Sequence, residues 1–172
     1  MSDFQAALQK TLTHEGGYQN NPEDSGNWYN GINYGTKYGI TPRDVANYFP
    51  SLISDPDCVR NLTVEQAGVI YKAGYWKDLY SQISDQLLAE KLFDSGVLFG
   101  VGTAVKLLQI SMQNEIGLVS DGAFGPNTLA AVNSNGDLAQ YRTVLINHVM
   151  GIINASPSQA EFVKGWLARI QS

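Results

Sequence analysis

The segment formed by residues 87–110 constrains the fold of this chain more than any other stretch of its 172 residues. Its apolar residues recur at helical spacing and cover most of the circumference of the helix that they predict. Other elements must bury a helix with so wide an apolar surface, so the pattern predicts a central helix inside a helical fold. Ser84-Asp85 is a start signal for this helix, and Gly100 and Gly102 are expected to divide it into two.

Helix start signals also precede the other amphipathic segments. They are capping residues, prolines at a first helical position, and capping boxes in which a Ser or Thr is followed three residues later by Glu or Gln. They stand at Thr41-Pro42, Thr63-Val64-Glu65-Gln66, Pro126, Asp137 and Ser156-Pro157-Ser158-Gln159. The helix after Thr41 is expected to end near residues 48–50, the helix after Thr63 near Tyr80, and the last helix at Arg169.

The region between the first helix and residue 50 has a different character. Residues 16–50 are rich in Gly, Asn and Tyr, which predicts irregular structure with a small hairpin around residues 34–40. Residues 117–125 are expected to form a second connection rich in turns. The sequence has no repeats and no long linker. It predicts a single domain over residues 1–172, mainly α, with a small irregular or β region after the first helix.

The composition argues against several classes of function. The net charge is −5 and no run of Lys or Arg occurs, which argues against a nucleic-acid partner. The sequence has no apolar stretch of about eighteen residues, so no membrane span is expected. The single cysteine, Cys58, cannot form an internal disulfide, and no His and Cys residues have metal-site spacing. We therefore expect neither a metal nor another cofactor.

The motif that carries chemistry is Thr13-His14-Glu15-Gly16-Gly17-Tyr18. It follows a helical stripe of apolar residues that begins at Phe4, and its two glycines are a stop signal. Glu15 is therefore expected in the last turn of that helix or just past it. The negative end of the helix dipole disfavours an anion there by about 0.3–1 kcal/mol. A carboxyl that is helped to keep its proton is suited to general acid catalysis.

This helix-end effect is too small to make an acid catalyst by itself, and burial against apolar surface must supply the rest. Aromatic residues that could form such a wall follow closely in the sequence: Tyr18, Trp28, Tyr34 and Tyr38. The alternative is that Glu15 is an ordinary helix-end carboxylate paired with a lysine or an arginine. The residues alone leave both interpretations open.

A series of short motifs extends along nearly the whole chain. They are His14-Glu15-Gly16-Gly17-Tyr18, Asn21-Pro22-Glu23-Asp24, Thr36-Lys37-Tyr38-Gly39-Ile40-Thr41, Tyr75-Trp76, Leu92-Phe93-Asp94-Ser95-Gly96-Val97 and Asp121-Gly122-Ala123-Phe124-Gly125-Pro126-Asn127-Thr128-Leu129. Together they resemble the N-acetylmuramidase family of phage endolysins and their prophage relatives, glycoside hydrolase family 108. The last motif resembles the peptidoglycan-binding-like region of such proteins. Some of these relatives are described as secretion activators.

The resemblance implies a lysozyme-like fold and hydrolysis of the β-1,4 bond between N-acetylmuramic acid and N-acetylglucosamine. It implies that Glu15 is the catalytic acid and that the partners are peptidoglycan glycan strands. Residues 1–100 would be the catalytic muramidase part, and residues 101–172 a peptidoglycan-binding-like helical part. Because Met1-Ser2-Asp3-Phe4 has neither a basic start nor a long apolar run, we expect synthesis in the cytoplasm without a signal peptide. The protein would act on the cell wall, in the periplasm, after release or export.

Phage-type lysozymes place an aspartate and then a threonine after the glutamate, and Asp24 and Thr36 are the matching residues. The carboxylate would stabilise an oxocarbenium-like transition state or orient water, which the hydroxyl would help to hold. The alternative is that both are ordinary turn or strand residues. Residues 25–35, which separate them, are longer than the usual glycine link of the family. They could instead lengthen the lip of a cleft, with Trp28 or Tyr29 stacking on sugar rings.

Aromatic residues are the candidates for binding sugar rings by stacking: Tyr18, Trp28, Tyr34, Tyr38 and Trp76. Core packing is the alternative for these side chains. Asp94 lies in the apolar central segment, so we expect it to have a hydrogen-bond partner and to support the cleft from beneath.

Two other functions use the same sequence features. A lytic transglycosylase would need the glutamate but no essential aspartate, and would leave anhydro sugar ends. A non-catalytic wall-binding or secretion-assisting protein would rely on the C-terminal motif and would tolerate the loss of Glu15.

Overall fold

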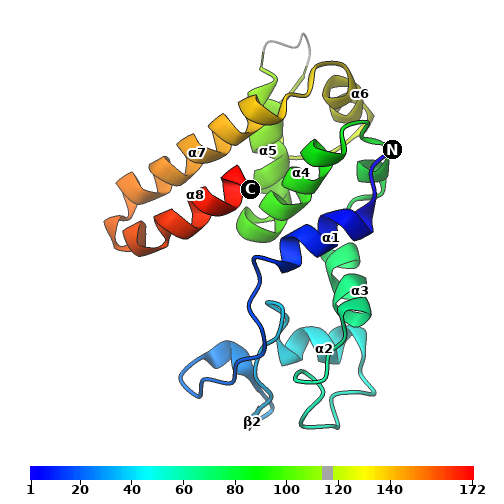
Figure 1. Ribbon diagram of the computed structural model, residues 1–172, viewed down its shortest axis with the longest axis vertical. Helices are drawn as coiled ribbons and strands as arrows, with labels where there is room; N and C mark the ends of the chain where they lie inside the picture. Colours follow the sequence, from blue (N-terminus) through cyan, green and yellow to red (C-terminus); the bar gives the residue numbers. More distant parts are fainter. Residues whose placement is uncertain (114–117) are drawn as a thin grey trace. The chain divides into compact units, whose positions relative to one another are not determined.

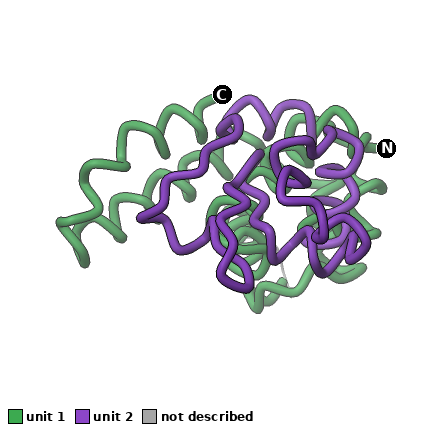
Figure 2. The backbone as a smooth tube through the Cα atoms, turned by 90° about the horizontal axis from the view of Figure 1, so that it is seen from below, with its two compact units in different colours: residues 1–7, 75–172 green, residues 8–74 purple. Residues whose placement is uncertain are grey.

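The computed structural model describes residues 1–113 and 118–172, which form two compact units. The N-terminal unit is Leu8–Gly74. The C-terminal unit combines Tyr75–Ser172 with the first residues of the chain, Met1–Ala7 (Figure 2). The α-helices of the described residues are α1 (Phe4–Leu12), α2 (Pro42–Tyr48), α3 (Val64–Tyr75), α4 (Gln86–Phe99), α5 (Val101–Ser111), α6 (Pro126–Asn135), α7 (Leu138–Ala155) and α8 (Val163–Gln171). The 3-10 helices are η1 (Ser25–Asn27), η2 (Asp78–Gln82) and η3 (Pro157–Phe162), and the strands are β1 (Trp28–Tyr29) and β2 (Ile32–Asn33).

The apolar segment 87–110 forms the centre of the C-terminal unit, as predicted. It is divided at Gly100 into α4 and α5, which pack against each other, and most of α4 is buried. Helix α7 packs on α5 and forms a hairpin with α8 (Figure 1). The buried Tyr141 hydroxyl of α7 donates a hydrogen bond to the carbonyl of Ala104 in α5 at 3.0 Å. The core of this unit is therefore built around the element that the sequence pattern singled out.

An aromatic cluster closes one part of the same core. Trp76 contacts Phe4, Tyr80 and Phe93 edge to face, with ring centroids 5.5, 5.6 and 5.7 Å away. Such pairs add about 0.5–1.5 kcal/mol each beyond the area that they bury. Trp76 is only 7% exposed. Its position is that of a core residue, the alternative to sugar stacking that the sequence left open.

Asp94 has the buried partner that its place in an apolar helix requires. It is 5% exposed, and the Arg169 Nε of α8 donates to its two carboxylate oxygens at 3.0 and 3.2 Å. Lys91, one turn away on α4, places its Nζ 3.8 Å from Asp94 Oδ2 and donates to the Arg169 carbonyl at 2.6 Å. This group of charges joins α8 to α4.

In the N-terminal unit, the helix starts follow the local signals. Thr41 and Asp44 form a capping box at the start of α2, with Pro42 in its first turn. Thr63 and Gln66 bond reciprocally at the start of α3, with N–H to oxygen distances of 2.9 and 3.2 Å. Local capping patterns are thus sufficient to predict where these helices begin.

The end of one helix differs from the sequence prediction, and the structure has a hairpin that the prediction did not include. Helix α3 ends at Tyr75 rather than near Tyr80, because Trp76 leaves the helical path to enter the aromatic cluster. Within residues 34–40 the predicted small hairpin is reduced to an antiparallel bridge between Lys37 and Ile40, and a further hairpin, β1–β2 with its turn at Asn30-Gly31, precedes it. Residues 118–125 are irregular, whereas residue 117 of the predicted connection lies outside the described residues.

The prediction that Ser156 opens the last helix with a capping box is wrong. The Ser156 side chain makes no cap hydrogen bond, and η3 precedes α8, which begins at Val163. The reason is that Ser156 already ends the preceding helix: its N–H bonds to the carbonyl of Ile152 in α7. Ser156 thus closes α7 and also precedes η3 at its N-cap position, without a side-chain cap bond.

Candidate active site

Glu15 lies just past the end of α1. The helix ends at Leu12, and the N–H groups of Thr13 and His14 bond back to the carbonyls of Lys10 and Thr11 at 3.1 and 2.9 Å. Glu15 follows this last turn and is half-buried. Its position is the second of the two that the sequence predicted.

A tight turn supports the Glu15 carboxylate. Lys37 and Ile40 pair in both directions, at 3.2 and 2.8 Å, across Tyr38 and Gly39, whose φ angles are +55° and +68°. Two successive left-handed residues are typical of the type I′ turn, in which glycine is favoured at the second position. A Cβ atom on Gly39 would lie 2.8 Å from Glu15 Oε2. The carboxylate therefore lies against Gly39, a position whose positive φ favours glycine.

Asp24 and Thr36 are linked through two amide side chains. The Thr36 hydroxyl donates to Asn27 Oδ1 at 2.6 Å, and Gln19 Nε2 donates to Asn27 Oδ1 at 2.9 Å and to Asp24 Oδ2 at 3.0 Å. Gln19 and Thr36 also pair through both of their backbone groups, at 2.9 and 2.7 Å. The aspartate and the threonine therefore belong to one hydrogen-bonded group.

This group lies along the same pair of chain segments as Glu15. The Tyr38 N–H bonds to the Gly16 carbonyl at 3.0 Å, next to Glu15, and Gln19 pairs with Thr36 further along the same segments. Gly39 lies three positions after Thr36, which is at most about 10 Å of extended chain. Thr36 therefore lies close along the chain to the turn that the Glu15 carboxylate contacts.

The insertion between Asp24 and Thr36 supplies the residue that connects them. Residues 25–35 form η1 and the β1–β2 hairpin, and Asn27 at the end of η1 is fully buried. Its Nδ2 donates to Gln19 Oε1 and to the Asn21 carbonyl, both at 2.9 Å. Because both the NH₂ group and the oxygen of its side-chain amide are hydrogen-bonded, Asn27 holds the loop that carries Asp24 against the segment that carries Thr36.

The candidate stacking residues differ in their environments. Tyr34 is 5% exposed, and its hydroxyl donates to the Ile53 carbonyl at 2.8 Å, so its ring belongs to the core. The Tyr18 ring has the Arg60 guanidinium 4.7 Å from its centroid, and a Cβ on Gly35 would meet its edge at 2.6 Å.

Trp28 and Tyr38 are the remaining candidates of this unit. Trp28 is 43% exposed, and its Nε1 donates to the Pro22 carbonyl at 3.0 Å. Tyr38 is half-buried, and it lies in the turn that supports Glu15. The Lys37 Nζ lies 5.2 Å from the centroid of the Tyr38 ring, and Tyr18 is half-buried too, so Trp28 is the most exposed of the candidates in this unit.

Sequence reasoning missed three residues of this site. Gln19 and Asn27 stand in a loop without periodicity, where asparagine and glutamine have common local uses. Tyr71 counts in the sequence only as an apolar position of a helix, yet its hydroxyl donates to the Tyr38 carbonyl at 2.7 Å. Each acts through a contact that no local pattern predicts.

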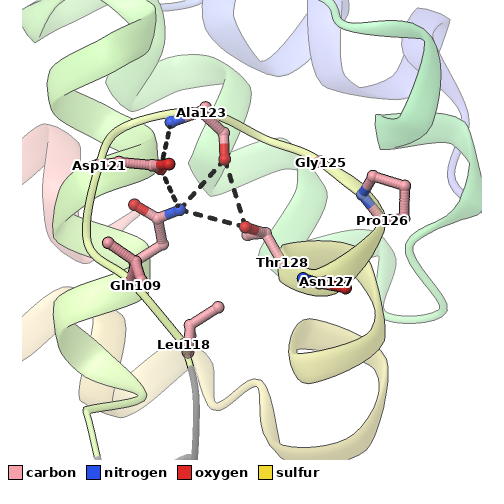
Figure 3. A pocket seen from close by; sticks show the side chains of 9 residues that line it. Gln109, Leu118, Asp121, Ala123, Gly125, Pro126, Asn127 and Thr128 are labelled. Carbon is pink, nitrogen blue, oxygen red and sulfur yellow. Dashed lines mark hydrogen bonds between the residues drawn. The ribbon is translucent and has the colours of Figure 1, made fainter.

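A second candidate site lies in the C-terminal unit, at the Asp-Gly-x-x-Gly-Pro-x-Thr motif. Residues of α5, of the segment just before the motif and of the motif itself line a pocket of about 290 Å³: Gln109, Leu118, Val119, Asp121, Ala123, Gly125, Pro126, Asn127 and Thr128 (Figure 3). The buried Gln109 amide donates to Asp121 Oδ1, the Ala123 carbonyl and Thr128 Oγ1, each at 3.1 Å, and accepts from the Gly122 N–H at 2.9 Å. Gln109 is thus the residue that holds the motif to α5.

The Asp121 carboxylate lines this pocket as an anion. The Ala123 N–H and then the Gln109 amide hold the pKa of Asp121 below its ordinary value, because both donate to the ionised form. Its exposed position leaves it in contact with solvent. The pocket therefore combines one negative charge with the apolar side chains of Leu118, Val119 and Pro126.

Replacing Gln109 with leucine is expected to destabilise the C-terminal unit by about 1–3 kcal/mol, because Thr128, Ala123 and Gly122 lose a buried partner. Urea unfolding followed by circular dichroism measures the change. Asn127→Ala is the control: the residue lines the same pocket but is exposed, and its loss should leave the midpoint nearly unchanged. Equal stability of the two variants would contradict the role assigned to Gln109.

Comparison with known proteins decides the family. Residues 8–100, more than half of the chain, match the sequence model of the family described as "Glycosyl hydrolase 108". The chain belongs to the glycosyl hydrolase 108 family. Residues 103–171 match a second model, described as "Predicted Peptidoglycan domain". The match to a glycosyl hydrolase 108 family together with a peptidoglycan domain identifies a protein that acts on peptidoglycan.

A solved structure supports the same assignment over the whole chain. The protein is similar to the structure titled "Structure of Brucella abortus SagA", with 27% identity and a TM-score of 0.68. The similarity covers 98% of this chain and 89% of that one. The search of curated proteins gave no match. The predicted fold class is confirmed: this glycosyl hydrolase 108 protein is mainly α and lysozyme-like, with a small β region after the first helix.

Two further properties concern residues 1–113 and 118–172 of this glycosyl hydrolase 108 protein. None of its helices there has both the length and the apolar character needed to cross a membrane. Within the same residues, no group of three or more His, Cys, Asp or Glu side chains is arranged to hold a metal ion.

Proposed function

We propose that this protein is a muramidase that hydrolyses the β-1,4 bond between N-acetylmuramic acid and N-acetylglucosamine in peptidoglycan. Glu15 is the general acid, and Asp24 and Thr36 hold the attacking water. The observation that supports the proposal most directly is the contact between the Glu15 carboxylate and the turn at Gly39. The chain segments that meet at this turn also carry the hydrogen-bonded group of Asp24 and Thr36. The family supports the reaction class and the partner.

The hydrogen bonds of Thr36 support its role with water. Its single hydroxyl proton goes to Asn27 Oδ1, so towards any further group the oxygen can only accept. Asp24 is exposed, and its carboxylate is acceptor-only when ionised. Two acceptors can together hold a water by its two hydrogens, which leaves the oxygen lone pairs free to attack the sugar.

The proposed reaction needs one proton donor and one water. Glu15 gives its proton to the glycosidic oxygen as the bond to the muramic acid carbon breaks. The water oxygen then bonds to that carbon, and its proton passes to Asp24. The products are a reducing muramic acid end and a free hydroxyl on the glucosamine.

The two parts of the chain have different proposed tasks. Residues 1–100 carry the cleavage, with Trp28, the most exposed of the aromatic candidates, and the half-buried Tyr18 and Tyr38 contacting sugar rings. Residues 101–172 hold the substrate as a peptidoglycan-binding-like part. The protein is proposed to act on the wall, in the periplasm, after release or export.

Replacing Thr36 with valine is expected to slow hydrolysis about 10–100-fold, because the attacking water loses one of its two acceptors. Thr36→Ser keeps the hydroxyl and should keep most of the activity. The measurement is the release of soluble fragments from purified, dye-labelled peptidoglycan by the two variants and the wild type. A valine variant as active as the serine variant would remove Thr36 from the mechanism and favour a lytic transglycosylase, which needs no water.

A further inference from the structure

The turn on which Glu15 rests is held from a second element. Tyr71 of α3 is 4% exposed, and its hydroxyl donates to the Tyr38 carbonyl at 2.7 Å. The Tyr71 hydroxyl oxygen would lie 3.3 Å from a Cβ on Gly39, the same position that lies 2.8 Å from Glu15 Oε2. Tyr71 and Glu15 therefore both lie against the same residue of the turn, Gly39.

The hydrogen bond from Tyr71 fixes an orientation as well as a contact. The Tyr38 carbonyl and the Gly39 nitrogen belong to one planar peptide group, so holding the carbonyl sets the plane of the whole group. That plane decides which side of Gly39 faces the carboxylate. Tyr38 has a φ of +55°, a conformation that non-glycine residues rarely adopt, so the turn depends on bonds from outside it.

We propose that Tyr71 is a positioning residue for the general acid: its hydroxyl holds the Tyr38–Gly39 peptide so that Glu15 stays aligned with the glycosidic oxygen. The proposal rests on the proposed function, in which Glu15 donates the proton. Tyr71 itself contacts no substrate in this account. It acts through the turn.

A purely structural role for Tyr71 makes a different prediction. The ring of a buried tyrosine packs as well as that of phenylalanine, so the hydroxyl alone carries the proposed effect. Tyr71→Phe keeps the ring and removes the hydroxyl that donates to the Tyr38 carbonyl. Tyr141→Phe is the matched control, because the buried Tyr141 hydroxyl makes the same kind of bond, to the Ala104 carbonyl at 3.0 Å, in the other unit.

The experiment measures kcat and KM of the full chain on soluble, uncrosslinked glycan strands, together with thermal unfolding. Tyr71→Phe is expected to lower kcat about 10–100-fold, the usual effect of a small misalignment of a reacting group, with KM changed less than twofold. Tyr141→Phe should leave both constants unchanged while lowering the unfolding temperature by a similar amount. If Tyr71→Phe loses stability like the control but keeps its kcat, the positioning role is wrong.

A second variant disturbs the contact between the turn and Glu15 without changing Tyr71. Gly39→Ala places a methyl group against Glu15 Oε2 and should also lower kcat more than it raises KM. If Tyr71→Phe does not fold, an unchanged kcat for Gly39→Ala would overturn the proposal. Glu15→Gln separates the two hypotheses. An inactive Glu15→Gln with a fully active Tyr71→Phe refutes the inference alone, whereas an active Glu15→Gln refutes the proposed function and the inference with it.

Discussion

Glu15→Gln is expected to lower the rate of peptidoglycan cleavage by about 100–10,000-fold, the usual contribution of a general acid. Glutamine keeps the shape of the side chain and its place against Gly39, but it has no proton to give to the leaving oxygen. The fold should be unchanged, since Glu15 lies past the end of α1 and only half-buried. The measurement is the initial rate of fragment release from purified peptidoglycan at equal protein concentration.

Glu23→Gln is the matched control for that variant. Glu23 is an exposed carboxylate in the same unit, one residue before Asp24, and it has no role in the proposed reaction. Its loss should change the rate less than twofold. Equal rates for wild type, Glu23→Gln and Glu15→Gln would show that Glu15 is not the acid. Retained wall binding without cleavage by the wild type would favour a non-catalytic protein.

Asp94→Ala is expected to destabilise the protein by about 3–5 kcal/mol, the usual result of removing one partner of a buried ion pair. Arg169 and Lys91 would keep their charges without the carboxylate that they share. The junction between α4 and α8 should weaken first. Urea unfolding by circular dichroism measures the total loss, and hydrogen exchange of α8 amides shows where it occurs.

An exposed ion pair provides the control. Asp57 and Arg60 lie 3.2 Å apart with most of both side chains in solvent, and pairs of this kind contribute about 0–1 kcal/mol. Asp57→Ala should therefore leave the urea midpoint close to that of the wild type. A loss no larger for Asp94→Ala than for Asp57→Ala would mean that α8 is held by its apolar contacts alone.

The parts of the fold that depend on residues close together in the sequence could be predicted. The start of α2 at Thr41, the capping box at Thr63 and the break at Gly100 each follow from chemistry within a few positions. Ser156 shows the limit of this reasoning. Its pattern satisfied the rule for a helix start, but the residue was already used to end α7.

Only the motif residues of the candidate site could be predicted from the sequence, and the residues that connect them could not. Glu15, Asp24 and Thr36 come from motifs, and their catalytic roles remain predictions. The residues that connect them act over long separations: Asn27 binds Thr36 nine positions away, and Tyr71 binds Tyr38 thirty-three positions away. Such contacts have no period and no fixed spacing. The buried positions of Tyr34 and Trp76 likewise depend on packing that a list of aromatic residues does not reveal.

The most direct test of the central claim is the chemistry of the new glycan ends. Purified peptidoglycan is digested by the wild type in ¹⁸O-labelled water, the ends are reduced at once with borohydride, and the fragments are analysed by mass spectrometry. The account predicts reducing N-acetylmuramic acid ends that each carry one ¹⁸O atom. Anhydromuramic acid ends without the label, or reducing N-acetylglucosamine ends, would contradict it.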